Sequence, residues 1–147
     1  MQSAIILDTP TRWKDYELLD CGDFEKLERF GEFITIRPEP QAVWPKILTE
    51  GEWKSKAHVR FVQKTSNSGE WQRIKKMPDQ WRMKYTLNNN EDIVFRLGLT
   101  AFKHVGVFPE QASNWDYIVD SIGKMKTAKP RVLNLFAYTG GASLAAA

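Results

Sequence analysis

Two adjacent glycines near the end of the chain, Gly140 and Gly141, have the type and spacing that most directly suggest chemistry. They follow residues 132–136, a short and mostly apolar run typical of a buried strand in a parallel sheet, and precede residues 142–147, which have the composition of a helix. Such a turn places unpaired backbone N–H groups beside the end of the strand, where a nucleotide-like ligand can approach the main chain. The stretch is predicted to be a cofactor loop, although an ordinary tight turn between a strand and a helix has the same pattern.

The spacing of the loop excludes two common nucleotide motifs. It is not the G-x-G-x-x-G fingerprint of dinucleotide-binding folds, and no Gly-Lys-Ser/Thr follows that would make it a P-loop. The loop therefore has to be interpreted from its particular residues.

Residues 132–147 read VLNLFAYTGGASLAAA. This stretch resembles motif I of class I S-adenosylmethionine-dependent methyltransferases, in the group around the bacterial large-subunit rRNA cytosine-C5 methyltransferases, where N-x-F-x-Y-T-G-G replaces the usual acidic, glycine-rich loop. Upstream, residues 93–97 and the segment FKHVGVFPEQ at 102–111 resemble the family's hairpin strand and its K-T-G-F-F-L-D-Q-R segment. The resemblance covers about residues 81–147.

The upstream segment also departs from the family. Gly106, Phe108 and Gln111 match the family residues, and Glu110 replaces an aspartate. Among the other positions, His104 replaces a lysine, Val105 a threonine and Ala112 an arginine. These departures indicate a divergent branch, so the substrate need not be an rRNA cytosine.

The resemblance implies S-adenosylmethionine as cofactor. The residues it assigns to the cofactor site are Phe108, Glu110, Gln111, Phe136, Tyr138, Thr139, Gly140 and Gly141. Glu110 can also be read as a solvated acid that suits the start of a helix. The family's catalytic residues lie downstream of motif I, so none is assigned here, and the chain is expected to be an inactive N-terminal fragment of an active enzyme.

The elements around these motifs predict an α+β fold. Residues 1–100 are predicted to form a mainly antiparallel β module, and residues 101–147 the start of a Rossmann-like methyltransferase domain, as a helix, a strand and a truncated second helix. Short edge strands are expected at 5–7 and 16–22, and further strands at 33–36, 58–63 and 71–75, with a polar loop at 65–69. A clear hairpin at 81–87 and 93–99 is expected to have one apolar and one basic face.

Two helices are predicted from capping signals. Asp23 is a suitable N-cap for a short helix with Leu27 and Phe30 at three-residue spacing, which Gly31 would end. Ser113 and Asp116 fit a capping box for a second helix, whose apolar face would include Trp115.

Composition limits the class of protein. The apolar content of 42% is enough for a core, and the single cysteine excludes an internal disulfide framework and a cysteine-rich zinc site. No metal site is expected. The N-terminus lacks a signal peptide and no stretch is long and apolar enough for a membrane span, so a cytoplasmic protein is expected.

The net charge of +3 hides a strong asymmetry, because residues 53–85 contain nine basic and two acidic residues. A polyanion-binding face requires such segregation, although lysines that only solvate a sheet face are the commoner cause of a charge cluster. RNA is the predicted partner, with Lys75, Lys76, Arg82 and Lys84 as phosphate contacts and Trp53 and Trp71 as candidates for stacking on bases. Trp81 and Trp115 are predicted core residues.

Two other functions remain open at this level. Residues 1–100 could be a nucleic-acid-binding β module without catalytic activity. The glycine turn could alternatively serve a nicotinamide or flavin oxidoreductase, against which the missing G-x-G-x-x-G counts. His104 could act as a base or ligand, but a lone histidine without a visible partner is more often structural.

Overall fold

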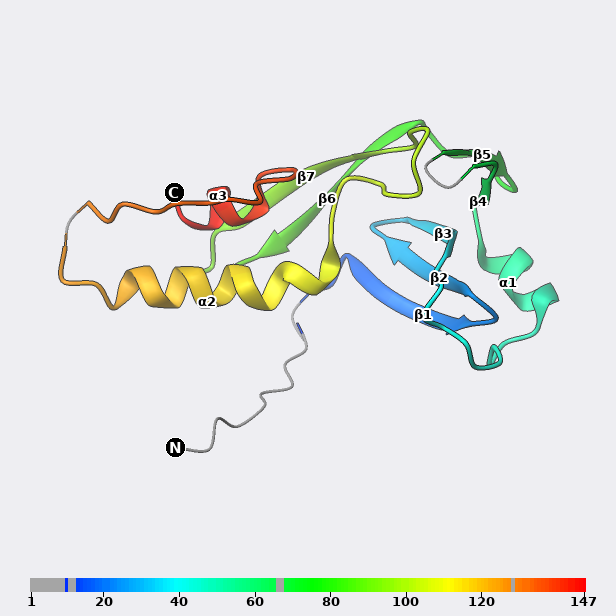
Figure 1. The fold of residues 1–147 in the computed structure, drawn as a ribbon, viewed down its shortest axis with the longest axis horizontal. Helices are drawn as coiled ribbons and strands as arrows, with labels where there is room; N and C mark the ends of the chain where they lie inside the picture. Colours follow the sequence, from blue (N-terminus) through cyan, green and yellow to red (C-terminus); the bar gives the residue numbers. More distant parts are fainter. Residues whose placement is uncertain (1–9, 11–12, 66–67, 128) are drawn as a thin grey trace. The chain divides into compact units, whose positions relative to one another are not determined.

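The computed structural model describes residue 10 and residues 13–65, 68–127 and 129–147. Contacts within the chain divide it into two compact units that alternate along the sequence (Figure 1). The sheet unit comprises Lys14–Lys84 and Val94–Val107, and the helix unit comprises Met1–Trp13, Tyr85–Ile93 and Phe108–Ala147. The chain therefore combines α and β structure, as the sequence predicted.

The sheet unit is built on a five-stranded sheet with the order β1-β2-β3-β4-β5. Its strands are β1 (Tyr16–Gly22), β2 (Glu25–Phe30), β3 (Phe33–Pro38), β4 (Val59–Gln63) and β5 (Gly69–Arg73). Neighbours pair antiparallel except β3 and β4, which are parallel because a crossover containing α1 (Glu50–Lys56) joins them. The strands predicted at 16–22, 33–36 and 58–63 are confirmed, the one predicted at 71–75 begins and ends two residues earlier, and residues 5–7 lie outside the described residues.

The helix α1, which the sequence did not predict, covers one face of this sheet. It starts with a capping box, in which the Thr49 hydroxyl accepts the Glu52 N–H at 3.3 Å and the Glu52 carboxylate accepts the Thr49 N–H at 2.8 Å. Trp53 projects from α1 into a core with Leu27 and Ile36, and all three are fully buried. The seven-residue helix α1 therefore packs on the sheet through one large aromatic residue.

The opposite face of the sheet is also buried, but around an ion pair. Nε and Nη2 of Arg37 in β3 donate to Oε2 of Glu28 in β2 at 2.9 and 2.6 Å, and both side chains are at least 96% buried. Tyr16 donates its hydroxyl to the other carboxylate oxygen at 3.0 Å. The interior strand β2 therefore has buried side chains on both faces, and the face opposite α1 includes the charged Glu28.

The prediction of a helix starting at Asp23 is wrong, since these residues form β2. Asp23 and Phe24 have φ of 48° and 63° and make the two-residue turn between β1 and β2, where Gly22 pairs with Glu25. Leu27 and Phe30 are three apart, yet they lie on opposite faces of one strand, and both are buried because both faces are covered. Gly31, with φ of 64°, belongs to the turn between β2 and β3 instead of ending a helix.

The predicted hairpin is confirmed as β6 (Gln80–Thr86) paired with β7 (Asp92–Gly98). Buried and exposed residues alternate along both strands. Trp81 is on the buried face, with its indole N–H donating to the Phe30 carbonyl at 3.0 Å, whereas Arg82 and Lys84 are exposed. The hairpin thus has one apolar and one basic face.

The helix unit contains the 3₁₀ turn η1 (Pro109–Gln111), α2 (Ala112–Gly123) and the short α3 (Gly141–Ala145), which lies alongside α2 (Figure 1). Trp115 of α2 packs edge-on against Trp13 and Tyr85, with ring centroids 5.7 and 5.6 Å away. Trp115 is 4% exposed, so its prediction as a core residue is confirmed.

Two details predicted for this region are wrong. Helix α2 begins at Ala112 without a side-chain cap, and Asp116 instead accepts hydrogen bonds from the Tyr85 hydroxyl and from the Asn88 N–H. Residues 132–136 are not a strand, and Leu133, Leu135 and Phe136 are 75–82% exposed. A strand requires a neighbour to pair its backbone groups, and no described strand pairs with these residues.

A search of the described residues finds no helix with the length and hydropathy required to cross a membrane.

Candidate functional site

The glycine loop is a tight turn with unusual backbone angles. Gly140 N–H donates to the Ala137 carbonyl at 2.7 Å, and the Gly140 carbonyl accepts from Leu144 N–H at 2.8 Å, so the turn leads directly into α3. Tyr138 has φ of 44° and Gly140 has φ of 90°. An L side chain is strained at such an angle, which is why the position before α3 favours glycine.

The neighbouring Gly141 has a different physical basis. A Cβ added to Gly141 would lie 2.7 and 2.8 Å from two atoms of the Trp115 indole, whereas a Cβ on Gly140 would meet nothing within 4 Å. Gly140 is thus required by the backbone of the turn, and Gly141 by the close packing of α3 on α2. Together they hold the loop against Trp115 while the space beside Gly140 remains open.

A cavity of about 390 Å³, here called the loop cavity, lies beside this turn within the helix unit. Its lining residues are Phe108, Glu110, Gln111, Trp115, Phe136, Ala137, Tyr138, Thr139, Gly141 and Ala142. Seven of the eight residues assigned to the cofactor are among them, and the eighth, Gly140, forms the turn at its edge. The two motifs found in the sequence, about 25 residues apart, therefore meet in one cavity.

The lining combines aromatic rings with one formal charge. The Phe108 and Tyr138 rings tilt against each other with centroids 5.0 Å apart. The exposed Glu110 carries the charge, and the Gln111 side-chain oxygen accepts the Asn114 amide N–H at 3.0 Å. Among the described residues that line this cavity there is no lysine or arginine.

The sequence analysis missed three residues of this cavity and one that supports it. Trp115, Ala137 and Ala142 line it, although Trp115 was assigned only to the core. Asn134 donates to the Ser143 hydroxyl at 3.0 Å and accepts the Phe136 N–H at 3.1 Å, which ties the preceding segment to α3. The asparagine in the motif was a signal that could have found this contact.

The predicted RNA contacts lie in the sheet unit and differ in accessibility. Lys75, Lys76, Arg82 and Lys84 are exposed. The ammonium of Lys75 donates to the carbonyls of Ser55 and Lys56 at the end of α1, so this lysine also has a structural role.

The two tryptophans proposed for base stacking do not present free faces. Trp53 is 0% exposed, with its indole N–H on Asp20 at 2.8 Å and the Lys46 ammonium 4.0 Å from its ring centroid, so the stacking prediction for Trp53 is wrong in this structure. Trp71 is half-buried, lies edge-on to Phe61 at 5.1 Å, and donates its indole N–H to the Thr100 carbonyl at 2.8 Å. These contacts indicate a structural role for Trp71.

Two solved structures are similar to this chain. The chain aligns over 97% of its length with the S-adenosylmethionine-dependent methyltransferase from Agrobacterium tumefaciens, with 34% sequence identity and a TM-score of 0.83. The chain has a methyltransferase-like fold. A candidate S-adenosylmethionine-dependent methyltransferase from Streptococcus mutans shares this fold over 92% of the chain, with a TM-score of 0.58 and 17% identity.

The methyltransferase-like chain spans 43% and 36% of the lengths of these two proteins, less than half of either. No protein-family model and no curated protein sequence matches it. The similarity therefore supports the methyltransferase level of the sequence prediction, and the rRNA cytosine-C5 group is not distinguished.

Proposed function

We propose that this chain is part of an S-adenosylmethionine-dependent methyltransferase, that its loop cavity binds the cofactor, and that the substrate is RNA. The observation that carries the proposal is the 34% identity over 97% of the chain to a protein described as such a methyltransferase. Seven of the eight residues assigned to the cofactor from the sequence line one cavity, and this arrangement agrees with the proposed cofactor site.

The chemistry of the loop cavity suits this cofactor. S-adenosylmethionine carries a methyl group on a sulfonium cation, together with an ammonium, a carboxylate and an adenine ring. Aromatic rings attract cations and stack on adenine, and the Glu110 carboxylate complements positive charge. The open space beside Gly140 allows a ligand to approach the backbone.

The same lining argues against the oxidoreductase alternative. A dinucleotide carries a pyrophosphate with negative charge, which is usually met by the N-terminus of a substantial helix after G-x-G-x-x-G. Here the loop lacks G-x-G-x-x-G, and the formal charge that Glu110 brings to the cavity is negative. We therefore favour the cationic cofactor.

The role of these residues in methyl transfer is binding and orientation. Transfer from a sulfonium depends mainly on alignment of the methyl group with the acceptor atom. Tyr138, Gly140 and Gly141 would fix the cofactor through the shape of the turn, and Glu110 and Gln111 would close the other side of the cavity. We expect the groups that activate the acceptor to lie outside residues 1–147, and residues 1–147 alone to be inactive. A cytoplasmic location is also expected.

Calorimetric titration of the full-length protein with S-adenosylmethionine and with NAD tests this proposal. We expect S-adenosylmethionine to bind and NAD not to bind. Gly140→Val should abolish cofactor binding because valine is strained at φ of 90° and fills the open space. Gly123→Val, which also meets nothing within 4 Å but lies at the end of α2, is the control and should bind normally. Equal affinity of the two variants would refute the site, and NAD binding would refute the cofactor.

A further inference from the structure

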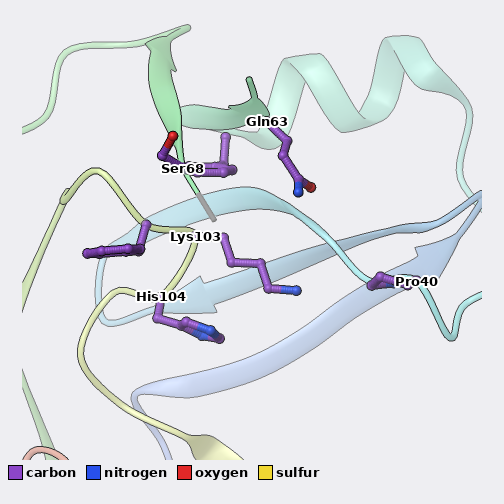
Figure 2. A pocket seen from close by; sticks show the side chains of 7 residues that line it. Pro40, Gln63, Ser68, Lys103 and His104 are labelled. Carbon is purple, nitrogen blue, oxygen red and sulfur yellow. The ribbon is translucent and has the colours of Figure 1, made fainter. Parts of the chain in front are cut away.

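A second cavity lies in the sheet unit and is lined by none of the residues assigned to the cofactor. It encloses about 480 Å³, within the range of about 300–1,000 Å³ typical of small-molecule sites. Its lining residues are Pro40, Phe61, Gln63, Ser68, Phe102, Lys103 and His104 (Figure 2). We call it the β4 cavity.

The floor of the β4 cavity is set by β4. Phe61 and Gln63 are two residues apart and therefore point to the same side of the strand. Phe61 is 4% exposed, and Gly69 allows its ring to lie against β5, since a Cβ there would be 2.5 Å from the ring. Through the parallel register of β3 and β4, this side is the sheet face of Arg37, opposite α1.

The rim is a loop, residues 98–105, that is fixed to the sheet unit at several points. Gly98 N–H donates to the Val105 carbonyl at 2.9 Å and closes the loop. The carbonyls of residues 100, 101 and 103 accept from the Trp71 indole at 2.8 Å, the Gly69 N–H at 3.0 Å and the Arg37 guanidinium at 3.1 Å. Because three successive parts of the loop are anchored, its backbone is held on the sheet unit before any ligand binds.

These anchors keep an aromatic side chain in contact with solvent. Phe102 is 57% exposed, although exposure of a phenylalanine is unfavourable. An exposed aromatic ring on an anchored backbone, at the edge of a cavity, can stack on an unpaired base, since every nucleobase has a π-face.

The polar lining complements the rest of a nucleotide. The side chains of Gln63 and Lys103 extend toward the same space, and His104 lies on the rim near them (Figure 2). The Gln63 amide nitrogen donates to the Thr65 carbonyl at 2.9 Å, and a base edge bound at this residue would share or replace that hydrogen bond. A lysine ammonium can contact a phosphate.

No described residue in the lining is acidic. The nearby Glu39 forms an ion pair with Lys26 at 3.1 Å. Burial acts to raise the pKa of Glu39, but the hydrogen bond and charge of Lys26 and the charge of Lys103 together lower it, so Glu39 offsets part of the positive charge of Lys103.

We propose that the β4 cavity binds an unpaired nucleotide of single-stranded RNA, with the base on Phe102, its edge at Gln63 and a phosphate at Lys103. This inference rests on the proposed function, in which the substrate, and therefore the source of the nucleotide, is RNA. It adds a site in the sheet unit that recognises single-stranded segments of the substrate.

Binding of fluorescein-labelled 12-nucleotide RNA to the full chain, followed by anisotropy at low salt, tests the inference. Phe102→Ala should weaken binding of the single strand about 5- to 100-fold and leave binding of a duplex of the same sequence nearly unchanged. The matched control is Phe24→Ala, since Phe24 is 59% exposed, is in the same unit and does not line the cavity. Lys103→Ala should weaken binding and reduce its salt dependence, whereas the exposed Lys14→Ala should not.

A crosslink gives an assay that does not depend on variant folding. RNA containing 4-thiouridine, irradiated with the unmodified chain, should label the peptide that contains residues 102–104. Equal affinities of the Phe102→Ala and Phe24→Ala variants, or labelling confined to other peptides, would overturn the β4 cavity as a nucleotide site while RNA remains the substrate. Absence of RNA binding by the unmodified chain at low salt would overturn both this site and RNA as substrate, but not cofactor binding, which is titrated separately.

Discussion

At the scale of single residues, Gly140 and Gly141 show that one motif can contain two unrelated constraints. Gly140 is constrained by its φ of 90°, and Gly141 by the Trp115 indole less than 3 Å from its missing Cβ. Substitution at the first position should affect the ligand, and substitution at the second should affect the packing of α3.

Gly141→Ala should therefore destabilise the helix unit by about 1–3 kcal/mol, the usual cost of overpacking. The added methyl group must displace either α3 or the Trp115 ring. Hydrogen exchange of the α3 amides and urea unfolding measure the effect. Gly123→Ala is the control, and it should be neutral or slightly stabilising because its Cβ meets nothing and alanine is the better helix former. A neutral Gly141→Ala would contradict the packing described here.

The carboxylate of Asp20 connects distant parts of the sheet unit through hydrogen bonds. Its carboxylate accepts the Trp53 indole N–H at 2.8 Å, the Leu48 N–H at 2.9 Å and the Ile47 N–H at 3.3 Å. Burial acts to raise the pKa of Asp20, but these hydrogen bonds together lower it below its usual value. The charged carboxylate thus links β1 to the segment that leads into α1.

The stability of the sheet unit should consequently depend on Asp20 and on pH. The pKa of Asp20 is lower in the folded state than in the unfolded state. Its carboxylate therefore makes its full contribution to the free energy of unfolding above the unfolded-state pKa, and this contribution is lost as pH falls through the folded-state pKa. Asp20→Asn should cost about 1–3 kcal/mol at pH 7, because an amide cannot accept all three donors. Urea unfolding at pH 7 and in strong acid should show this difference shrinking in acid. Asp23→Asn, at an exposed turn residue, is the control and should leave the free energy of unfolding at pH 7 nearly unchanged.

At the scale of elements, the pair of Arg37 and Glu28 joins the sheet to the rim of the β4 cavity. The guanidinium uses two nitrogens for Glu28 and donates through the third to the Lys103 carbonyl. Arginine suits this position because its planar fork can serve both partners at once. The fold of β2 and β3 thus positions the loop that contains Phe102.

Removing one member of this buried pair should be far more costly than removing both. Glu28→Gln should destabilise by about 3–5 kcal/mol by leaving Arg37 buried and unpaired, and Glu28→Leu with Arg37→Met should recover much of that loss. The surface pair of Arg29 and Glu17, 3.2 Å apart across β1 and β2, is the control and should contribute less than about 1 kcal/mol. A double-mutant cycle by urea unfolding makes both measurements. Similar coupling energies for the two pairs would contradict this account.

At the scale of the whole molecule, the basic segment is less positive than its sequence indicates. Arg60 pairs with Glu25 and Glu50, which lie outside residues 53–85. Within the segment, Lys64 pairs with Glu70 and Arg73 with Asp79. The fold therefore offsets part of the positive charge of the segment, while the side chains of Lys76 and Arg82 are exposed.

If these residues contact RNA phosphates, affinity should fall steeply with salt. Charge reversal at Lys75, Lys76, Arg82 and Lys84 should weaken binding to many sequences alike and flatten the salt dependence. Anisotropy titrations of the full chain across a salt series test this. Truncation at residue 100 is unsuitable, because Tyr85–Ile93 belongs to the same unit as Phe108–Ala147. A salt-independent affinity, or a loss confined to one sequence, would refute phosphate contact by this face.

Local patterns in the sequence were sufficient wherever neighbours along the chain decide the structure. The alternation in β6 and β7, the helical spacing around Trp115 and the turn before α3 all depend on residues a few positions apart. The lining of the loop cavity was also largely predictable, because two recognisable motifs contain most of its residues.

Tertiary structure alone decided what depends on distant partners. Residues 23–31 were predicted as a helix because their local sequence does not indicate that Arg37 pairs with Glu28 in a buried sheet. The local sequence of residues 132–136 likewise does not indicate whether a neighbouring strand pairs with them. The β4 cavity combines residues from 40 to 104, and nothing in the local sequence of any of them indicates the others. The physical reason is that burial, ion pairing and strand pairing depend on which residues meet in space, whereas periodicity and turn chemistry depend only on the adjacent chain.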